Sequence, residues 1–97
     1  MIVVFRDEKT KKLITNRKKL TAKYGKDTVL QLARRINLLE AVDSIDELVD
    51  GRYPGNWEWL LGDRAGQASA RLSGGFRLVV EPGEISEVVI IEIVNYH

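Results

Sequence analysis

The chain has 97 residues, 44% of them hydrophobic and 30% charged, with a formal net charge of +1. This is an ordinary globular composition, and the length predicts one domain over residues 1–97. The sequence has no cysteine and one histidine, so we expect no disulfide, no metal and no cofactor. It also contains no signal peptide and no run of about 20 apolar residues, which predicts a cytoplasmic protein with no membrane partner.

The charges are divided unevenly along the chain. Residues 1–37 hold eleven Lys or Arg against three acidic residues, whereas residues 38–97 hold four Arg against eleven acidic residues. No lysine follows Lys26. Such a split indicates a basic surface for an anionic partner. The alternative, which the composition leaves open, is a helix whose lysines are simply solvated.

The first half of the chain predicts one strand followed by helices. We expect a strand over Met1–Phe5, short helices over Asp7–Asn16 and Arg17–Tyr24, and a longer helix over Thr28–Val42. Apolar residues recur at helical spacing through this last segment, and Arg34 and Arg35 lie off that stripe.

Side chains near the ends of these helices suggest caps. Asp27 is the predicted N-cap of the long helix. Ser44 is the predicted N-cap of a further turn, with Glu47 as its capping-box partner.

The second half predicts strands joined by glycine-rich turns. Strands are expected over Trp57–Leu61, Gln67–Leu72, Phe76–Glu81 and Ile85–Val94. Short turns between successive strands require antiparallel neighbours. The predicted fold class is therefore α+β: a short N-terminal strand, two to three helices, then an antiparallel β-meander with the helices packed on one face.

Three arginines in the acidic half are candidates for binding phosphate. Arg64 lies in a predicted turn, and Arg71 and Arg77 flank the next turn. Because side chains alternate along a strand, Arg71 and Arg77 should share the polar face of that hairpin. The guanidinium group is planar and always charged, which suits a phosphate. The residues leave open that these arginines are solvated or form ion pairs, for example with Glu81 or Glu92.

The chain ends on Asn95, Tyr96 and His97, after a long β-branched run. Such a run belongs inside a sheet, so an ordered strand would hold an amide, a phenol and an imidazole at one edge of the domain. That combination suggests contact with a polar ligand.

Several motifs, taken in order, resemble the HigB branch of the RelE/ParE toxin superfamily. They are Phe5-Arg6-Asp7, Leu60, Gly62-Asp63-Arg64-Ala65-Gly66-Gln67, Ser69, Arg71-Leu72, Phe76-Arg77-Leu78 and Glu92-Ile93-Val94-Asn95-Tyr96-His97. The last motif is the most specific, because it is similar to the family's terminal acidic-Ile-Val-Asp-Tyr-His. The resemblance spans nearly the whole chain and implies a RelE-like toxin of a type II toxin–antitoxin pair.

The resemblance also implies an activity. It points to a metal-independent endoribonuclease, an mRNA interferase, that cuts mRNA on the translating ribosome. A HigA-like helix-turn-helix antitoxin would neutralise it and would itself bind operator DNA. Carried over, Arg64, Arg71 and Arg77 would bind the scissile phosphate, and Tyr96 and His97 would supply stacking and acid–base chemistry. The basic helices would hold ribosomal RNA through Lys18, Lys19, Lys23, Arg34 and Arg35.

The sequence departs from the family pattern at three positions. Asn95 replaces the usual Asp, and Glu58 and Leu61 stand where many relatives have a histidine and a lysine. Glu58 could act as a base, but it cannot bind phosphate. Two alternatives therefore stay open. One is a ParE-type gyrase inhibitor on the same scaffold, and the other is a degenerate, non-catalytic toxin that binds an antitoxin or another partner.

Overall fold

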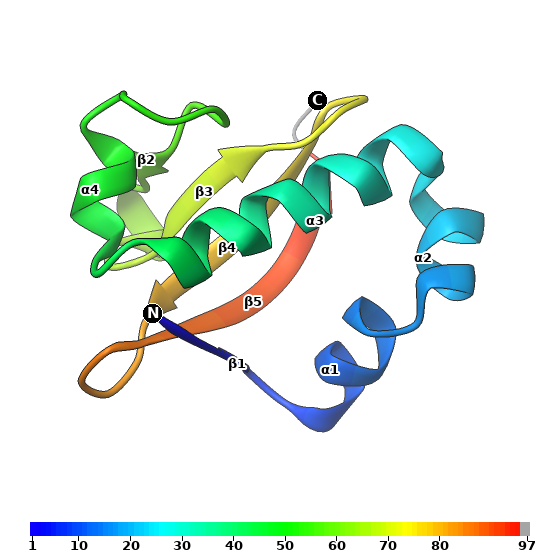
Figure 1. Ribbon diagram of the computed structural model, residues 1–97, viewed down its shortest axis with the longest axis horizontal. Coiled ribbons are helices and arrows are strands. Elements are labelled where there is room, and N and C mark those ends of the chain that lie inside the picture. The colour runs from blue at the N-terminus through cyan, green and yellow to red at the C-terminus, as the bar shows by residue number, and fades with distance from the viewer. Residues whose placement is uncertain (96–97) are drawn as a thin grey trace.

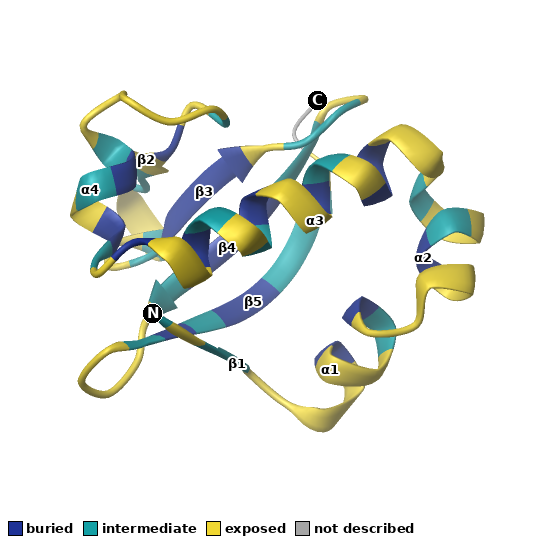
Figure 2. Cartoon of the chain, viewed as in Figure 1, coloured by how far each residue is buried: buried dark blue, intermediate teal, exposed yellow. Residues whose placement is uncertain are grey.

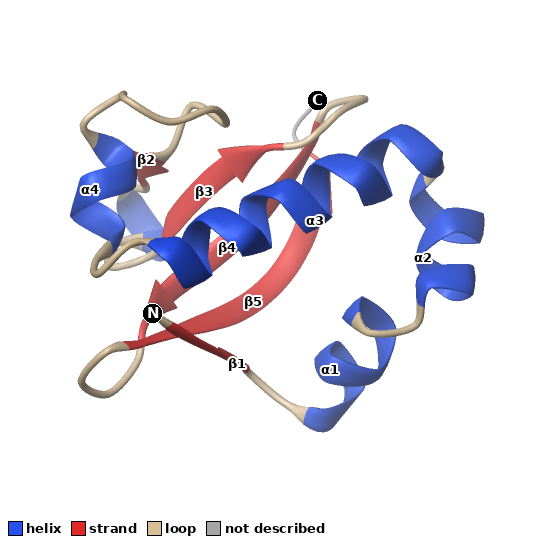
Figure 3. Ribbon diagram, viewed as in Figure 1, coloured by secondary structure: helices blue, strands red, loops and turns tan. Residues whose placement is uncertain are grey.

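The computed structural model describes residues 1–95 and shows a five-stranded sheet in that range, with helices packed on one face (Figures 1 and 3). The elements are β1 (Ile2–Phe5), α1 (Glu8–Ile14), α2 (Arg17–Tyr24), α3 (Lys26–Ala41), α4 (Ile45–Val49), β2 (Glu58–Trp59), a 3-10 helix (Gly62–Arg64), β3 (Ala68–Arg71), β4 (Phe76–Pro82) and β5 (Glu87–Asn95). The α+β prediction is confirmed. No helix in the described range is long and apolar enough to cross a membrane.

The strands lie in the order β1-β5-β4-β3-β2. Strands β2 to β5 form the predicted antiparallel meander. Strand β1 adds to its far edge and runs parallel to β5, with Ile2 opposite Glu87 and Phe5 opposite Ile90. The sheet therefore joins the two ends of the chain, and the helices between β1 and β2 pack against it.

Helix α3 runs across the sheet and covers the core (Figures 1 and 2). Leu32 and Leu39 of this helix are buried with Leu78 and Val80 of β4 and Ile90 of β5. Removing this apolar surface from water is the main source of stability in a domain of this size.

Local predictions at the element ends were only partly right. Helix α3 begins at Lys26 with Gly25 as its N-cap, so Asp27 lies in the first turn instead of at the cap. Gly25 has a φ of +88°, a conformation that glycine adopts without strain. Ser44 is the N-cap of α4, as predicted, although its side chain makes no capping hydrogen bond. The Glu47 carboxylate accepts from the Asp43 N–H at 3.2 Å, one residue before the predicted partner. The predicted strand over 57–61 is reduced to Glu58–Trp59, and Trp57 before it is buried in the core.

The turn between β3 and β4 is fixed to the helices by two contacts. The Thr28 hydroxyl of α3 lies 2.7 Å from the Ser73 hydroxyl. The rings of Tyr24 and Phe76 meet edge to face, with centroids 5.0 Å apart and an interplanar angle of 86°. The hairpin that carries Arg71 and Arg77 is therefore held at its tip as well as along its strands.

Strand β5 contains a β-bulge in the middle of its pairing with β4. Val80 is opposite Ile90 and Val79 is opposite Glu92, so Ile91 is an extra residue on β5. The bulge reverses the side-chain alternation: Ile90 and Ile93 both join the core under the helices. Glu92 consequently faces the other side of the sheet.

Candidate functional site

The sheet face opposite α3 carries a connected set of polar side chains, which we call the arginine face. Its members are Glu58, Gln67, Ser69, Arg71, Arg77, Glu81 and Glu92, with Arg64 reaching in from the 3-10 helix. Strand register puts Glu58 beside Ser69 and Arg71 beside Arg77. The predicted common face of Arg71 and Arg77 is therefore present.

Arg77 forms an ion pair with Glu58 across the sheet. Its Nη1 donates to Glu58 Oε1 at 2.9 Å and lies 3.4 Å from the Ser69 hydroxyl. The Arg77 side chain is 20% exposed and that of Glu58 is 58% exposed, so the cation is the more enclosed partner. A carboxylate and a guanidinium thus lie side by side, one at the solvent and one partly sheltered.

Gln67 and Glu92 are among the acceptors that hold Arg64. Its Nη1 donates to Gln67 Oε1 at 2.9 Å, and its Nη2 donates to Glu92 Oε2 at 2.8 Å. The Gln67 amide in turn donates to Glu81 Oε2 at 3.3 Å. The alternative of an ion pair with Glu92 is therefore realised at Arg64, which lies in the same polar network as Glu81.

A hollow of about 510 Å³ opens beside these pairs. Its lining residues are Glu58, Leu60, Leu61, Asp63, Arg64 and Arg77. The Leu61 residue is 88% exposed, so an apolar side chain stands at its mouth. Two cations, Arg64 and Arg77, share this hollow with two carboxylates, Glu58 and Asp63, so a bound anion must take the place of a carboxylate at one of the cations.

Arg71 lies on the other side of Arg77. It is exposed, and with Arg77 it lines a second hollow of about 320 Å³. Its backbone is fixed because its N–H donates to the Gly55 carbonyl at 2.7 Å. Arg77 therefore lies between two hollows, one shared with Arg64 and one with Arg71.

Of the three terminal residues, Tyr96 and His97 lie outside the described residues. Asn95 is exposed at the end of β5, where it pairs with Phe76. Phe76 contacts Tyr24 of α2, so the register places Asn95 in the row that faces the helices. Asn95 is thus not brought to the arginine face.

Four of the five predicted RNA-binding residues are exposed on the helical layer: Lys18, Lys19 and Lys23 on α2 and Arg34 on α3. Lys23 also stands 5.5 Å above the ring of Tyr24. Arg35 differs from the expectation, as it is only 8% exposed.

The burial of Arg35 has a structural reason. Its Nε donates to the Arg71 carbonyl at 3.0 Å, which ties α3 to β3. Burial, and next the charge of Arg34, lower the pKa of this guanidinium. Gly55 lies so close that a Cβ there would come within 2.7 Å of Arg35 Nε. Arg35 therefore supports the β3 end and does not belong to the exposed basic surface.

Sequence reasoning did not include Gln67, Ser69 or Glu92 among the site residues. The alternation of polar and small residues along β3 was the available signal for Gln67 and Ser69. Glu92 was considered only as a possible ion-pair partner of these arginines, because the bulge that turns it toward them left no mark in the sequence.

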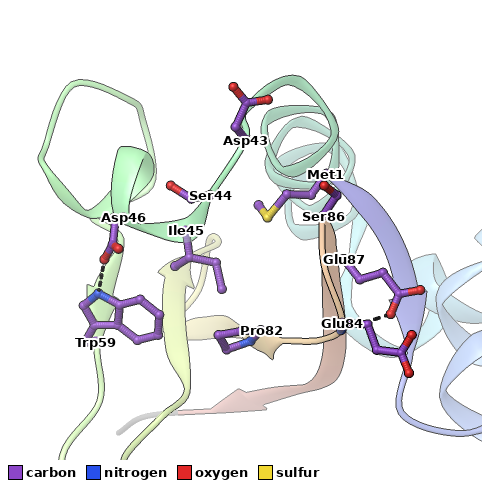
Figure 4. A pocket seen from close by; sticks show the side chains of 10 residues that line it. All are labelled: Met1, Asp43, Ser44, Ile45, Asp46, Trp59, Pro82, Glu84, Ser86 and Glu87. Atoms are coloured by element: carbon purple, nitrogen blue, oxygen red, sulfur yellow. Dashed lines mark hydrogen bonds between the residues drawn. The ribbon is translucent and has the colours of Figure 1, made fainter.

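A smaller hollow of about 260 Å³ lies at the other end of the sheet, between α4 and the β4–β5 turn (Figure 4). Met1, Ile45, Trp59 and Pro82 contribute apolar surface, and four carboxylates line it: Asp43, Asp46, Glu84 and Glu87. Within residues 1–95 no three His, Cys, Asp or Glu side chains are grouped so as to hold a metal ion. The arginines contribute nothing to this hollow.

Comparisons with known proteins identify the fold. The sequence matches no family model and no curated protein. Solved structures do match: a YoeB/ParE toxin from Agrobacterium tumefaciens has a TM-score of 0.69 and 17% identity, with 100% of both chains covered. A YoeB dimer from Staphylococcus aureus has a TM-score of 0.62 and 20% identity, covering 100% of this chain and 97% of that chain. A YoeB–YefM complex from the same organism gives 0.63 and 21% over the same shares. The chain therefore has the fold of the YoeB/ParE toxins.

Proposed function

We propose that the protein is the toxin of a type II toxin–antitoxin pair and that it cleaves translated mRNA as a metal-independent endoribonuclease. The observation that carries the proposal is the Glu58–Arg77 pair, 2.9 Å apart at the rim of a hollow that also contains Arg64. When the 2′-hydroxyl of the RNA attacks the adjacent phosphate, a base must accept its proton and cations must bind the phosphate, and Glu58, Arg77 and Arg64 could fill these roles. The toxin fold and the motif order resembling HigB support the same proposal.

The residues fit the steps of this reaction. The substrate phosphate takes the place of Glu58 at Arg77, and the released carboxylate accepts the proton of the 2′-hydroxyl. The 2′-oxygen then bonds to phosphorus while the bond from phosphorus to the 5′-oxygen breaks, leaving a cyclic phosphate and a 5′-hydroxyl. Arg77 and Arg64 stabilise the charge that grows on the phosphate oxygens. The proton for the leaving oxygen comes from His97, a role that rests on the resemblance alone.

The partners follow from the same proposal. A solved YoeB–YefM complex from Staphylococcus aureus joins a toxin of this fold to its antitoxin. We propose an antitoxin for this chain as well, of the helix-turn-helix HigA type that the motifs imply, with operator DNA bound only through that antitoxin. The ribosome and mRNA would meet the arginine face in the cytoplasm, and the exposed cations of α2 would add contacts to ribosomal RNA.

Induction of the chain without antitoxin, followed by primer extension on translated mRNA, tests the activity. Wild type should produce cleavage sites and arrest growth, whereas Arg77→Ala should lose at least about a hundredfold in cleavage because it removes a transition-state donor. Arg52→Ala is the matched control, since Arg52 is 83% exposed and pairs with Asp50 away from the arginine face.

The other outcomes each identify a rival. DNA-damage signalling with intact mRNA would point to a ParE-type gyrase inhibitor. Tight binding to the product of a neighbouring helix-turn-helix gene, with no growth arrest, would indicate a degenerate toxin kept as a binding protein. Cleavage that is equal in wild type and Arg77→Ala would reject this site.

A further inference from the structure

We infer that Glu92 is a positioning residue: through the bulge in β5 it fixes the guanidinium of Arg64 over the hollow beside Arg77. The inference deepens the proposed function and rests on it for its effect on cleavage. It assigns no chemical step to Glu92, which binds Arg64 and holds it in place.

Arg64 needs an external support because of where it lies in the chain. It ends a 3-10 helix of only three residues in the connection between β2 and β3, whereas Arg71 and Arg77 stand on paired strands. A long side chain on such a connection loses rotamer entropy when it is held in one geometry. Two acceptors in the described range come from β5 and from the residue that precedes β3: Glu92 at 2.8 Å and Gln67 at 2.9 Å.

The bulge is what makes Glu92 available. With Ile91 as an extra residue, Glu92 pairs with Val79 and shares the side of the sheet that carries Ser69 and Glu58. If the same sequence paired with β4 without a bulge, strict alternation after Ile90 would turn Glu92 toward the helices. Bulges next to functional sites often redirect one side chain in this way.

Gln67 completes the support. An amide has one acceptor and one donor end, and both are used: Oε1 accepts from Arg64, and Nε2 donates to Glu81 Oε2 at 3.3 Å. Glu81 therefore fixes which way the amide points, which in turn keeps the acceptor end toward Arg64. Glu92 acts on the guanidinium directly, and Glu81 acts on it through Gln67.

Stability alone does not account for this arrangement. The Arg64 and Glu92 side chains are 34% and 37% exposed, and ion pairs at such sites contribute little to folding. Two acceptors on one partly exposed guanidinium are more useful for holding a cation where a phosphate will arrive.

The test compares two substitutions that both remove the charge. Glu92→Met has no strong acceptor, whereas Glu92→Gln keeps an oxygen that can accept from Arg64. We expect Glu92→Met to lower the cleavage rate of a translated mRNA about tenfold to a hundredfold, the effect of a misplaced catalytic group. Glu92→Gln should stay within about threefold of wild type, because its acceptor remains. Combining Glu92→Met with Arg64→Met should lower the rate no further than Arg64→Met alone.

Binding and folding are measured on the same variants. Affinity for a 2′-O-methyl RNA hexamer, which cannot be cleaved, should be unchanged or higher in Glu92→Met, since a negative charge is lost. The melting temperature of Glu92→Met should match that of the control Glu84→Met, because Glu84 is a turn carboxylate outside the arginine face. A faster Glu92→Met enzyme, additive losses in the double variant, or equal rates in the Met and Gln variants would each overturn the inference.

An NMR measurement on the Arg64 guanidinium tests its positioning independently of RNA cleavage. The Nη–H resonances of Arg64, whose groups donate to Gln67 and Glu92, should be sharp and slow to exchange in wild type and in Glu92→Gln, and broadened in Glu92→Met. If wild type cleaves no RNA but this pattern holds, the proposed function fails while the positioning of Arg64 stands. If wild type cleaves RNA and the resonance is unaffected by Glu92→Met, only the positioning of Arg64 fails.

Discussion

The cations of the arginine face and those of the helical layer differ in how they are held. Arg64 and Arg77 donate to side-chain oxygens at 2.8–2.9 Å, and these acceptors lie on the sheet or directly before one of its strands. Lys18 and Lys19 lie on the exposed side of α2, where solvent surrounds them. Both groups attract anions, but only the first can place a phosphate relative to a carboxylate. On the proposed function, net charge would guide RNA to the helical layer, and strand register would set where it reacts.

Arg35 shows that a cation of the helical layer is not always exposed to solvent. It belongs to α3, yet it is buried and donates to the Arg71 carbonyl, while the neighbouring Arg34 is exposed. One residue of difference on a helix turns a side chain by about 100°, which follows from 3.6 residues per turn. Position on the helix thus separates a structural arginine from a surface one.

The largest expected effect on RNA cleavage comes from a substitution at Arg77 that keeps the positive charge and changes the geometry of the donor group. Arg77→Lys retains the cation but loses the planar guanidinium whose Nη1 donates to Glu58 and whose fork suits a phosphate. We expect RNA cleavage to fall roughly a hundredfold, close to the loss of a transition-state donor. Lys19→Arg, the reverse exchange on α2, should leave cleavage unchanged. Equal activity of Arg77→Lys and wild type in primer extension would remove the distinction between the two groups of cations.

A smaller effect, on stability, is expected from the buried helix arginine. Arg35→Ala leaves the Arg71 carbonyl without this donor and opens space against Gly55. The free energy of unfolding should fall by about 2–4 kcal/mol, the range for breaking a buried hydrogen bond and creating a cavity. Arg34→Ala should change it by less than about 0.5 kcal/mol, as for most surface substitutions. Urea denaturation of both variants measures the difference, and similar midpoints would show that Arg35 is not structural.

Much of the fold was predictable from the sequence because its signals are local. The β-branched run ending at Val94, the glycine turns and the helical stripe through Leu32 and Leu39 each report on burial by periodicity. The same period of two placed Arg71 and Arg77 on one face, and strand register confirms it.

What could not be predicted depends on contacts far apart in the sequence. The bulge at Ile91 arises from pairing with Val79 and Val80, and the β-branched run contains nothing that marks it. The side of the sheet on which Glu92 lies was therefore hidden, although its charge made it a possible partner of the arginines. Arg35 was assigned to the surface by its charge, since only the Arg71 carbonyl and Gly55 reveal its burial. Asp27 was predicted as the N-cap because its side chain can accept a hydrogen bond, but Gly25 caps the helix through its backbone conformation alone.

The smallest expected effect concerns the exposed lysines of α2. If Lys18 and Lys19 attract RNA by charge alone, Lys18→Gln and Lys19→Gln should each weaken binding only modestly at physiological salt. On single-stranded RNA, the slope of log affinity against log salt concentration should fall by about 0.7 for each phosphate that is no longer neutralised. On duplex RNA the corresponding fall should be about 0.9, the value for duplex DNA. Arg52→Gln, which removes an exposed cation paired with Asp50, should not change the slope. An unchanged slope in both lysine variants would mean that α2 carries solvated charge and that RNA binds the arginine face alone.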